Sequence, residues 1–340
     1  MSTAIATEVP LISFLNRLET QDWNAAIQKL LPSIHEVDKN ATQIWFSFFP
    51  LPLHQALSKA EDPELLAREL LLQGDYKLST QIDSSHQFLY GHRYWPQVKK
   101  AIEQYATESK SATDSLADQI VTIAGSAAKV AKVDQSLTIG ITAVGLMTLR
   151  QVGLTAFRAA TGRISIAAQP ARKTPDQILK ARAKDDSQGL LGFLKTVDKK
   201  WTVVFDENDD TAKYKLNNLQ DLAWGAADDK SRNWVEIDPR RIEGPIPVEC
   251  RSASCGTCWV GVLGGAEKLA PVAPRESKKI KEFGYIETDD PKPLIRLACQ
   301  AQTTGAVSIV IPPWNGVFGK PLKAKQQSLR DDLAADESVN

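Results

Sequence analysis

The side chains in this sequence best suited to specific chemistry are four cysteines, all at or after position 250 of 340. Three of them, Cys250, Cys255 and Cys258, share one short segment, and Cys299 lies farther along. The chain begins without a basic stretch followed by a long apolar run, so no secretory signal is predicted. In a reducing cytoplasm, grouped cysteines bind metal more often than they form disulfides. The four thiols are therefore candidate metal ligands.

The spacing C-x4-C-x2-C…C is that of plant-type 2Fe–2S sites. Two tetrahedral irons bridged by two sulfides need four thiolates, and small residues between the ligands let the backbone wrap the cluster. Backbone N–H groups in such a loop can point at the sulfurs. Structural zinc is the alternative, but zinc sites usually show two short cysteine pairs, whereas here three ligands share one loop.

The surrounding sequence predicts the elements that must position these ligands. Residues 201–205 and 212–216 read as two strands joined by the turn sequence DENDD, which predicts a β-hairpin. Asn218 is predicted to cap a helix over 219–227, and a strand is predicted over 307–311. A hairpin followed by a helix is the opening of a β-grasp fold.

With these elements in place, residues 201 to about 313 resemble the β-grasp 2Fe–2S ferredoxin family, with plant-type and adrenodoxin-like features. The resemblance is carried by the hairpin and helix, by PVECRSASCGTCWVGVL, and by RLACQAQ before the last strand. It implies a one-electron carrier, with a reduction potential near about −400 mV. The residues implied to bind or enclose the cluster are the ligands Cys250, Cys255, Cys258 and Cys299 and the loop residues Arg251, Ser252, Ser254, Gly256 and Thr257.

Two departures from the family pattern are visible. Family members commonly have glycine where this chain has Ala253; if the site needs positive φ, alanine costs about 1 kcal/mol. The chain also carries insertions around Trp234–Pro247 and between Pro271 and Asp290, the second with a helical pattern over Glu276–Phe283. These insertions alter the rim of the site, so the partner cannot be carried over from the family.

Residues 1–168 show helical apolar periodicity without a catalytic motif. The predicted fold class is α+β, an N-terminal all-α domain followed by a C-terminal β-grasp ferredoxin-like domain. The predicted domains are a helical domain of unknown role over 1–168, a basic linker over 169–200, the ferredoxin domain over 201–320 and a polar tail over 321–340.

Three features of the helical region have competing interpretations. The aromatic stretch from Trp45 to Phe49 is expected in the core rather than on a partner surface. His86 and His92 are expected to pack beside aromatic neighbours, and a haem or metal role is the weaker reading. The uncharged run over 136–149 is shorter than a membrane span and is expected to be a buried helix, with a membrane-surface or partner-docking helix as the competitor.

Composition limits the functions further. The 41 basic and 41 acidic residues cancel, and no phosphate-binding glycine loop is present, so nothing favours nucleic-acid or nucleotide binding. We expect a cytoplasmic electron carrier rather than a catalyst by itself, with no catalytic residues of its own. Its helical region would tether it to a redox protein partner in a larger complex, with membrane association at most peripheral. The alternative is a binding or assembly protein whose cluster is structural or redox-sensing.

Overall fold

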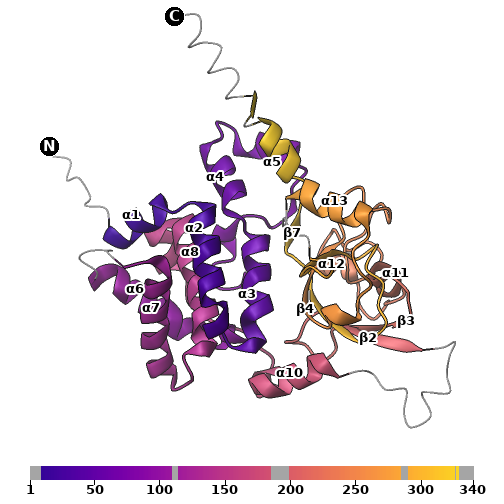
Figure 1. The fold of residues 1–340 in the computed structure, drawn as a ribbon, viewed down its shortest axis with the longest axis horizontal. Helices are drawn as coiled ribbons and strands as arrows, with labels where there is room; N and C mark the ends of the chain where they lie inside the picture. Colours follow the sequence, from indigo (N-terminus) through magenta and orange to yellow (C-terminus); the bar gives the residue numbers. More distant parts are fainter. Residues whose placement is uncertain (1–8, 109–113, 185–198, 285–289, 326, 329–340) are drawn as a thin grey trace, which may run out of the picture. The chain divides into compact units, whose positions relative to one another are not determined.

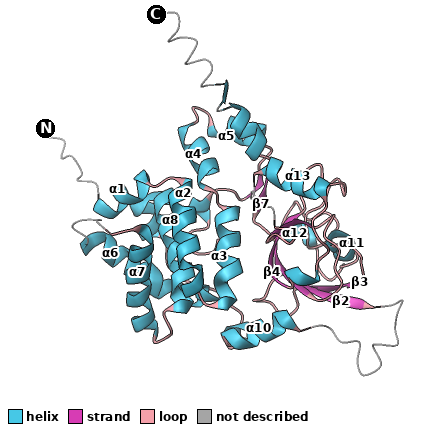
Figure 2. Cartoon of the chain, viewed as in Figure 1, coloured by secondary structure: helices cyan, strands magenta, loops and turns pink. Residues whose placement is uncertain are grey.

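The computed structural model describes residues 9–108, 114–184, 199–284, 290–325 and 327–328. The chain divides into two compact units (Figure 1). Unit 1 comprises residues 1–46 and 77–179, and unit 2 comprises residues 47–76 and 180–340. The predicted fold class is confirmed, because helices dominate the N-terminal half and a mixed β-sheet lies in the C-terminal part (Figure 2).

Unit 1 is a helical body in which amphipathic helices bury their apolar faces against one another. Helices α6, α7 and α8 pack together, α1 lies against α8, and α2 lies against α7. The last residues of α3 and α10 belong to unit 2. The helices are α1 (Pro10–Arg17), α2 (Thr20–Leu30), η1 (Leu31–Ser33), α3 (Glu36–Phe48), η2 (Leu78–Thr80), η3 (Tyr90–Tyr94), α6 (Trp95–Glu108), α7 (Leu116–Ala131), α8 (Ser136–Ala159), α9 (Ala168–Ala171) and α10 (Pro175–Ala183).

Helix α8 contains the apolar run that was predicted to be buried. Every residue from Leu137 to Leu149 is buried. At Gly145 an added Cβ would lie 2.6 Å from the Ile102 side chain, so glycine permits close helix packing here. Within the described residues, α8 alone has the length and composition of a membrane span, yet 72% of its apolar window is buried inside the protein. This burial favours a core helix.

The aromatic stretch at the end of α3 is also buried. Trp45 and Phe48 are fully inaccessible to solvent and Phe49 nearly so, while Phe46 is partly exposed. These rings are therefore core residues, as predicted.

His86 and His92 form a buried pair inside unit 1. Their Nδ1 atoms lie 2.9 Å apart, and His86 Nε2 lies 3.2 Å from the carbonyl oxygen of Ile82. Because a carbonyl only accepts, His86 carries its proton on Nε2, and His92 donates from Nδ1 to His86. Burial lowers the pKa of His86 well below its usual value and that of His92 to about 4. The two rings pack and hydrogen-bond as expected, and the Trp95 ring packs on His86 at a tilt of 53° with ring centroids 4.2 Å apart.

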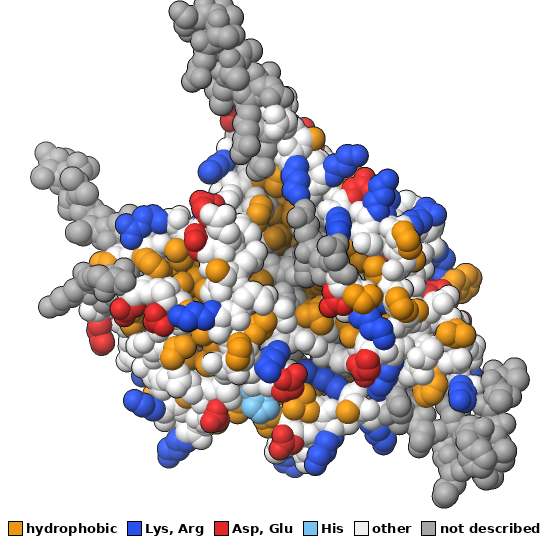
Figure 3. Space-filling model, in the orientation of Figure 1, with side chains coloured by type: hydrophobic (Ala, Val, Ile, Leu, Met, Phe, Trp, Pro, Cys, Tyr) orange, Lys and Arg blue, Asp and Glu red, His pale blue; other side chains and the backbone are white. Residues whose placement is uncertain are grey.

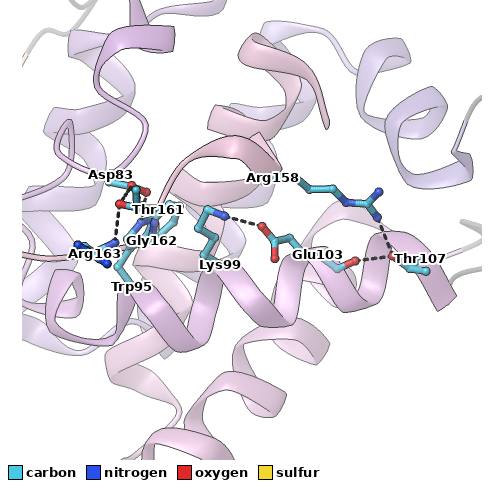
Figure 4. Close-up of polar contacts among 9 residues, drawn as sticks. All are labelled: Asp83, Trp95, Lys99, Glu103, Thr107, Arg158, Thr161, Gly162 and Arg163. Atoms are coloured by element: carbon cyan, nitrogen blue, oxygen red, sulfur yellow. Dashed lines mark hydrogen bonds and ion pairs between the residues drawn. The ribbon is translucent and has the colours of Figure 1, made fainter. Parts of the chain in front are cut away.

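Asp83 fastens the segment that follows α8 (Figure 4). Its carboxylate accepts hydrogen bonds from Trp95 Nε1 (2.8 Å), the Gly162 N–H (2.8 Å) and the Thr161 hydroxyl (3.1 Å). The chain after α8 is thereby held against the start of α6.

Unit 2 contains both the sheet and the cysteines. Its central element is a five-stranded mixed sheet with the order β3-β2-β6-β4-β5. The elements are α4 (Leu51–Lys59), α5 (Pro63–Glu69), β1 (Gln73–Gly74), β2 (Lys200–Val204), β3 (Lys213–Asn217), α11 (Leu222–Ala227), α12 (Trp234–Ile237), β4 (Trp259–Gly264), η5 (Ala266–Lys268), α13 (Pro274–Phe283), β5 (Ile295–Leu297), β6 (Val307–Val310) and β7 (Trp314–Asn315).

The sheet has the predicted β-grasp arrangement. Strands β2 and β3 form the predicted antiparallel hairpin, and β2 also pairs in parallel with the late strand β6. Strand β4 runs antiparallel to both β5 and β6. Helix α11 packs closely on the hairpin because Gly225 has no Cβ, which would lie 2.4 Å from Leu216.

Residues 47–76 belong to unit 2, although the sequence placed them in a helical domain over 1–168. Strand β1 pairs antiparallel with β7, and the Val317 N–H donates to the Leu70 carbonyl at 2.9 Å. Phe48 packs edge-on against Trp259, with ring centroids 4.8 Å apart. The two units therefore do not coincide with the predicted domains, because helical periodicity identifies a helix but not the surface on which it packs.

The segment predicted as a linker over 169–200 is partly helical. It contains α9 and α10. Arg182 of α10 forms a bidentate ion pair with Glu207, with N–O distances of 2.8 and 2.9 Å. Residues 185–198 lie outside the described residues. The polar and basic composition predicts a solvated chain, but one of its basic residues, Arg182, forms a buried ion pair.

Two other boundaries differ from the predictions. Helix α11 begins at Leu222 and is capped by Asp221, whose side chain accepts from the Trp224 N–H at 2.9 Å. Asn218 is not the cap, because the backbone of residues 219–222 hydrogen-bonds to residues 301–303 instead of coiling. In the predicted tail over 321–340, residues 319–325 form a helix that buries Leu322, and residues 329–340 lie outside the described residues.

Candidate iron–sulfur site

The four cysteine side chains come together as two interacting pairs. Cys250, Cys255 and Cys258 lie on the loop that leads into β4, and Cys299 lies on the turn after β5. Side-chain hydrogen bonds join Cys250 to Cys255 and Cys258 to Cys299. The pairs also interact electrostatically with each other, Cys255 with Cys258 and Cys250 with Cys299. All four are free thiols, and two thiols at each of two positions are what a two-iron cluster requires.

Backbone N–H groups of the loop point at the sulfurs. The Ser254 N–H donates to Cys250 Sγ at 3.3 Å. Further backbone hydrogen bonds to sulfur come from Ser252 to Cys250, from Cys250 and Thr257 to Cys255, from Cys299 to Cys258 and from Ala253 to Cys299. Such donors stabilise negative charge on thiolates and on a reduced cluster.

Left-handed backbone conformations turn these N–H groups inward. Arg251, Ala253 and Gly256 have φ values of +47°, +57° and +74°. Alternation of left- and right-handed residues makes a concave row of N–H donors that suits an anion. Ala253 therefore has the positive φ for which alanine is expected to cost about 1 kcal/mol relative to glycine.

The two thiols of each pair differ in pKa. Burial would raise the pKa of Cys250, but hydrogen bonds from Ser252, Cys255 and Ser254 lower it to about 6, whereas burial raises that of Cys255. The hydrogen bond with Cys258 lowers the pKa of Cys299 to about 7, while the pKa of Cys258 is raised. Each pair thus contains one readily ionised thiol, and metal ligation requires thiolates.

The other predicted loop residues line this site in different ways. The Ser252 and Ser254 hydroxyls hydrogen-bond to each other at 2.6 Å, and Thr257 is buried beside Cys255. The Arg251 guanidinium lies 4.3 Å from the centre of the Trp224 ring and forms an ion pair with Glu243. Arg251 therefore ties the loop to α11 and to the insertion around 234–247.

Cys299 is reached through β5, which pairs with the strand that follows Cys258. The Ala298 N–H donates to the Cys258 carbonyl at 2.8 Å, and Trp259 pairs with Leu297. Gln300 Nε2 lies 3.6 Å from Cys299 Sγ, close enough for a hydrogen bond to sulfur. The sheet itself therefore brings the distant fourth cysteine to the first three.

The residues present fit a 2Fe–2S cluster. The donor set is four thiols, with Cys258 and Cys299 buried and Cys250 and Cys255 partly exposed. The main influences on the four thiols are backbone N–H groups, hydroxyl and amide side chains, and the other thiols. Within those residues, no three His, Cys, Asp or Glu side chains form a group suited to one metal ion.

Several residues that contact the site are not indicated by the sequence pattern. Trp224, Glu243 and Phe283 reach the loop from α11, the first insertion and α13. Nothing in their local sequence marks them, because they approach through tertiary packing. Gln300 was detectable in principle, since it directly follows the fourth cysteine.

Comparison with known protein families agrees with this geometry. Residues 235–304 match the family described as 2Fe-2S iron-sulfur cluster binding domain. That stretch contains all four cysteines and α13. Neither the curated proteins nor the solved structures gave a match to the chain.

Proposed function

We propose, on the premise that residues 235–304 form a 2Fe–2S iron–sulfur cluster binding domain, that this protein is a one-electron carrier. Cys250, Cys255, Cys258 and Cys299 hold the cluster. The observation that carries the proposal is the arrangement of four free thiols in two pairs with backbone N–H groups directed at the sulfurs.

The cluster, when bound, accepts and returns one electron without making or breaking a bond in a substrate. The chain's own part is to hold the sulfurs and to stabilise added negative charge. The N–H groups of Ser252, Ser254, Thr257 and Ala253 do so without moving, because the loop backbone is fixed in advance. Burial of Cys258 and Cys299 keeps water from half of the site.

The electron enters and leaves through the side where Cys250 and Cys255 are partly exposed. Trp224 of α11 contacts Arg251 of the cysteine loop, and further large apolar side chains are exposed on α12 and on the segment that follows it. These side chains are Trp224 (53% exposed), Val235 (46%), Ile237 (54%) and Ile242 (68%). Exposed apolar side chains of this size mark interaction surfaces, so the partner docks here.

The proposal is tested by visible absorption and electron paramagnetic resonance spectra of anaerobically purified full-length protein before and after dithionite. We expect the signal of a reduced 2Fe–2S centre, and a redox titration that fits one reversible electron. Cys258→Ser and Cys299→Ser should lose most of the absorbance. A colourless wild-type protein that carries zinc would contradict the proposal and support a structural site.

We further propose that unit 1 tethers the carrier to a redox partner within a larger cytoplasmic complex, where any contact with a membrane is peripheral. The support is indirect: unit 1 is a helical body as large as many separate domains, and the chain's balanced charge provides little electrostatic steering. Cross-linking of the complex followed by mass spectrometry tests the tether. Cross-links to the partner from Lys129, Lys132 and Lys173 are expected, and cross-links confined to unit 2 would contradict it.

A further inference from the structure

Helix α13 contacts both segments that carry the cysteines. It lies in the insertion before Cys299 and buries three side chains, those of Glu276, Ile280 and Phe283. Two of these three residues reach the cysteine-bearing segments from one helix. A single element is thus in a position to fix both halves of the site.

Phe283 packs on the loop between the second and third cysteines. A Cβ added at Gly256 would lie 3.1 Å from two carbon atoms of the Phe283 ring, so the ring rests directly on the glycine. The Phe318 N–H donates to the Phe283 carbonyl at 3.2 Å, which holds the end of α13 in place. Because Phe283 is 1% exposed, the ring also excludes water from this side of the loop.

Glu276 holds the strand that leads to the fourth cysteine. Its carboxylate accepts from Arg296 Nε at 2.9 Å and Nη2 at 3.0 Å, and both side chains are 1% exposed. It also accepts from the Leu297 N–H at 2.9 Å, two residues before Cys299. Arg296 Nη1 donates in turn to the Ala270 carbonyl at 3.0 Å. Strand β5 is therefore fixed by charged hydrogen bonds that water does not reach.

We propose that α13 positions the cluster, with Phe283 and Glu276 as positioning residues. Phe283 sets the place of the loop with Cys255 and Cys258, and Glu276 sets the place of the turn with Cys299. The distance between the two thiol pairs then depends on one rigid helix. This inference rests on the proposed function, since it assigns α13 a role toward the cluster.

Altering either residue has a defined electrostatic consequence. Reduction adds one negative charge to the cluster, so water or positive charge nearby favours the reduced state. Phe283→Leu opens space beside Gly256 and admits water. Glu276→Gln removes a negative charge and leaves Arg296 without a counter-ion. Both changes shift the reduction potential in the positive direction.

The experiment compares Glu276→Gln and Phe283→Leu with Glu207→Gln in the full-length, cluster-loaded protein. Glu207 forms a similarly bidentate ion pair with Arg182. It also accepts a hydrogen bond from the Ser308 hydroxyl, and Ser308 pairs with Gly264 at the end of β4 remote from Cys258. The measurements are the reduction potential, the g-values of the reduced cluster, the visible circular dichroism and the midpoint of thermal unfolding.

For Glu276→Gln and Phe283→Leu we expect a positive shift in potential, altered g-values and at least tenfold faster loss of visible absorbance to a chelator. Glu207→Gln should lower only the unfolding midpoint. Wild-type g-values and potential in the two α13 variants, or equal shifts in Glu207→Gln, would overturn the inference. If Glu276→Gln does not fold, the reduction potential and g-values of Phe283→Leu alone test the inference. A wild-type protein without a cluster would instead contradict the proposed function.

Discussion

At the scale of single residues, Gly256 meets two constraints that favour glycine. Its φ is +74°, and an added Cβ would lie 3.1 Å from the Phe283 ring, closer than an ordinary van der Waals contact.

We expect Gly256→Ala to cost about 1 kcal/mol from the positive φ, and about 1–3 kcal/mol more because the Phe283 ring has to give way. In a Phe283→Leu background the second part should be smaller. Urea unfolding, followed by circular dichroism for the helices and by visible absorbance for the cluster, measures the variants. Equal costs of Gly256→Ala in the two backgrounds would show that Phe283 does not confine the loop.

His86 and His92 make unit 1 sensitive to acid. Both have folded-state pKa values below the unfolded value of 6.5, that of His92 at about 4. Above pH 6.5 both are neutral in either state, so their stabilising arrangement is fully present. As the pH falls from 6.5 toward 4, only the unfolded chain takes up protons, and the unfolding free energy drops by about 1.4 kcal/mol per pH unit for each histidine.

Urea unfolding of unit 1 between pH 7 and 4 checks this slope. His92→Gln keeps a donor toward His86 Nδ1 while removing one titrating group, so the dependence on pH should become shallower. A wild-type stability that is flat over this range would contradict the buried neutral pair.

Residue spacing marked the four cysteines as candidate ligands, and the family resemblance pointed to the unusual Ala253, because both depend on local sequence. The sequence did not predict the cap of α11, since Asn218 and Asp221 are equally good caps by residue type. The choice is made by backbone bonds to residues 301–303, which lie far away in sequence. The contacts of Arg251 with Trp224 and Glu243 could not be predicted for the same reason.

At the scale of elements, the segment 47–76 completes unit 2, and Phe48 is its most buried contact. We expect Phe48→Ala to destabilise unit 2 by about 3–5 kcal/mol, because the ring leaves a cavity against Trp259. The measurement is the urea midpoint for loss of visible absorbance. Phe46→Ala is the matched control on the same helix, since Phe46 packs on Trp23 and Trp45 in unit 1. An unchanged midpoint in Phe48→Ala would contradict the assignment of this segment to unit 2.

The hairpin, the central strands and α13 could be predicted because each shows its own period of apolar residues. Strand β1 could not, because two residues have no period. Its pairing with β7 exists only through tertiary folding, and so does the membership of α4 and α5 in unit 2.

At the scale of the whole molecule, charge is balanced and interspersed. The 41 basic and 41 acidic residues cancel, and the face in Figure 3 shows basic and acidic side chains intermingled with apolar ones. Electrostatic steering raises association rates by about 10–10³-fold when a charged face is available. Here the apolar side chains beside the cluster are the better candidates for partner contact.

We therefore expect the rate constant for electron transfer to the partner to change less than about tenfold between low salt and roughly 0.5 M salt, where the Debye length is only a few ångströms. Trp224→Ala should lower the rate at every salt concentration, and Leu65→Ala on α5, away from both proposed contact surfaces, is the exposed apolar control. Stopped-flow kinetics measures both variants. A steep fall with salt in the wild type would show that charge, rather than apolar contact, governs docking.

The pairing of β1 with β7 joins two segments that are synthesised far apart in time. Gln73 leaves the ribosome about 240 residues before its partner Asn315, which at roughly 5–20 residues per second is a delay of about 12–50 s. Until the later strands are made, α4, α5 and the Phe48 ring lack part of the surface they will cover, since Trp259, the partner of Phe48, follows it by 211 residues (259 − 48). Cluster insertion must follow, since Cys299 and β6 are also made late. A nascent chain that stalls before residue 300 would thus expose apolar helices without a metal site, a form that chaperones and proteases would recognise.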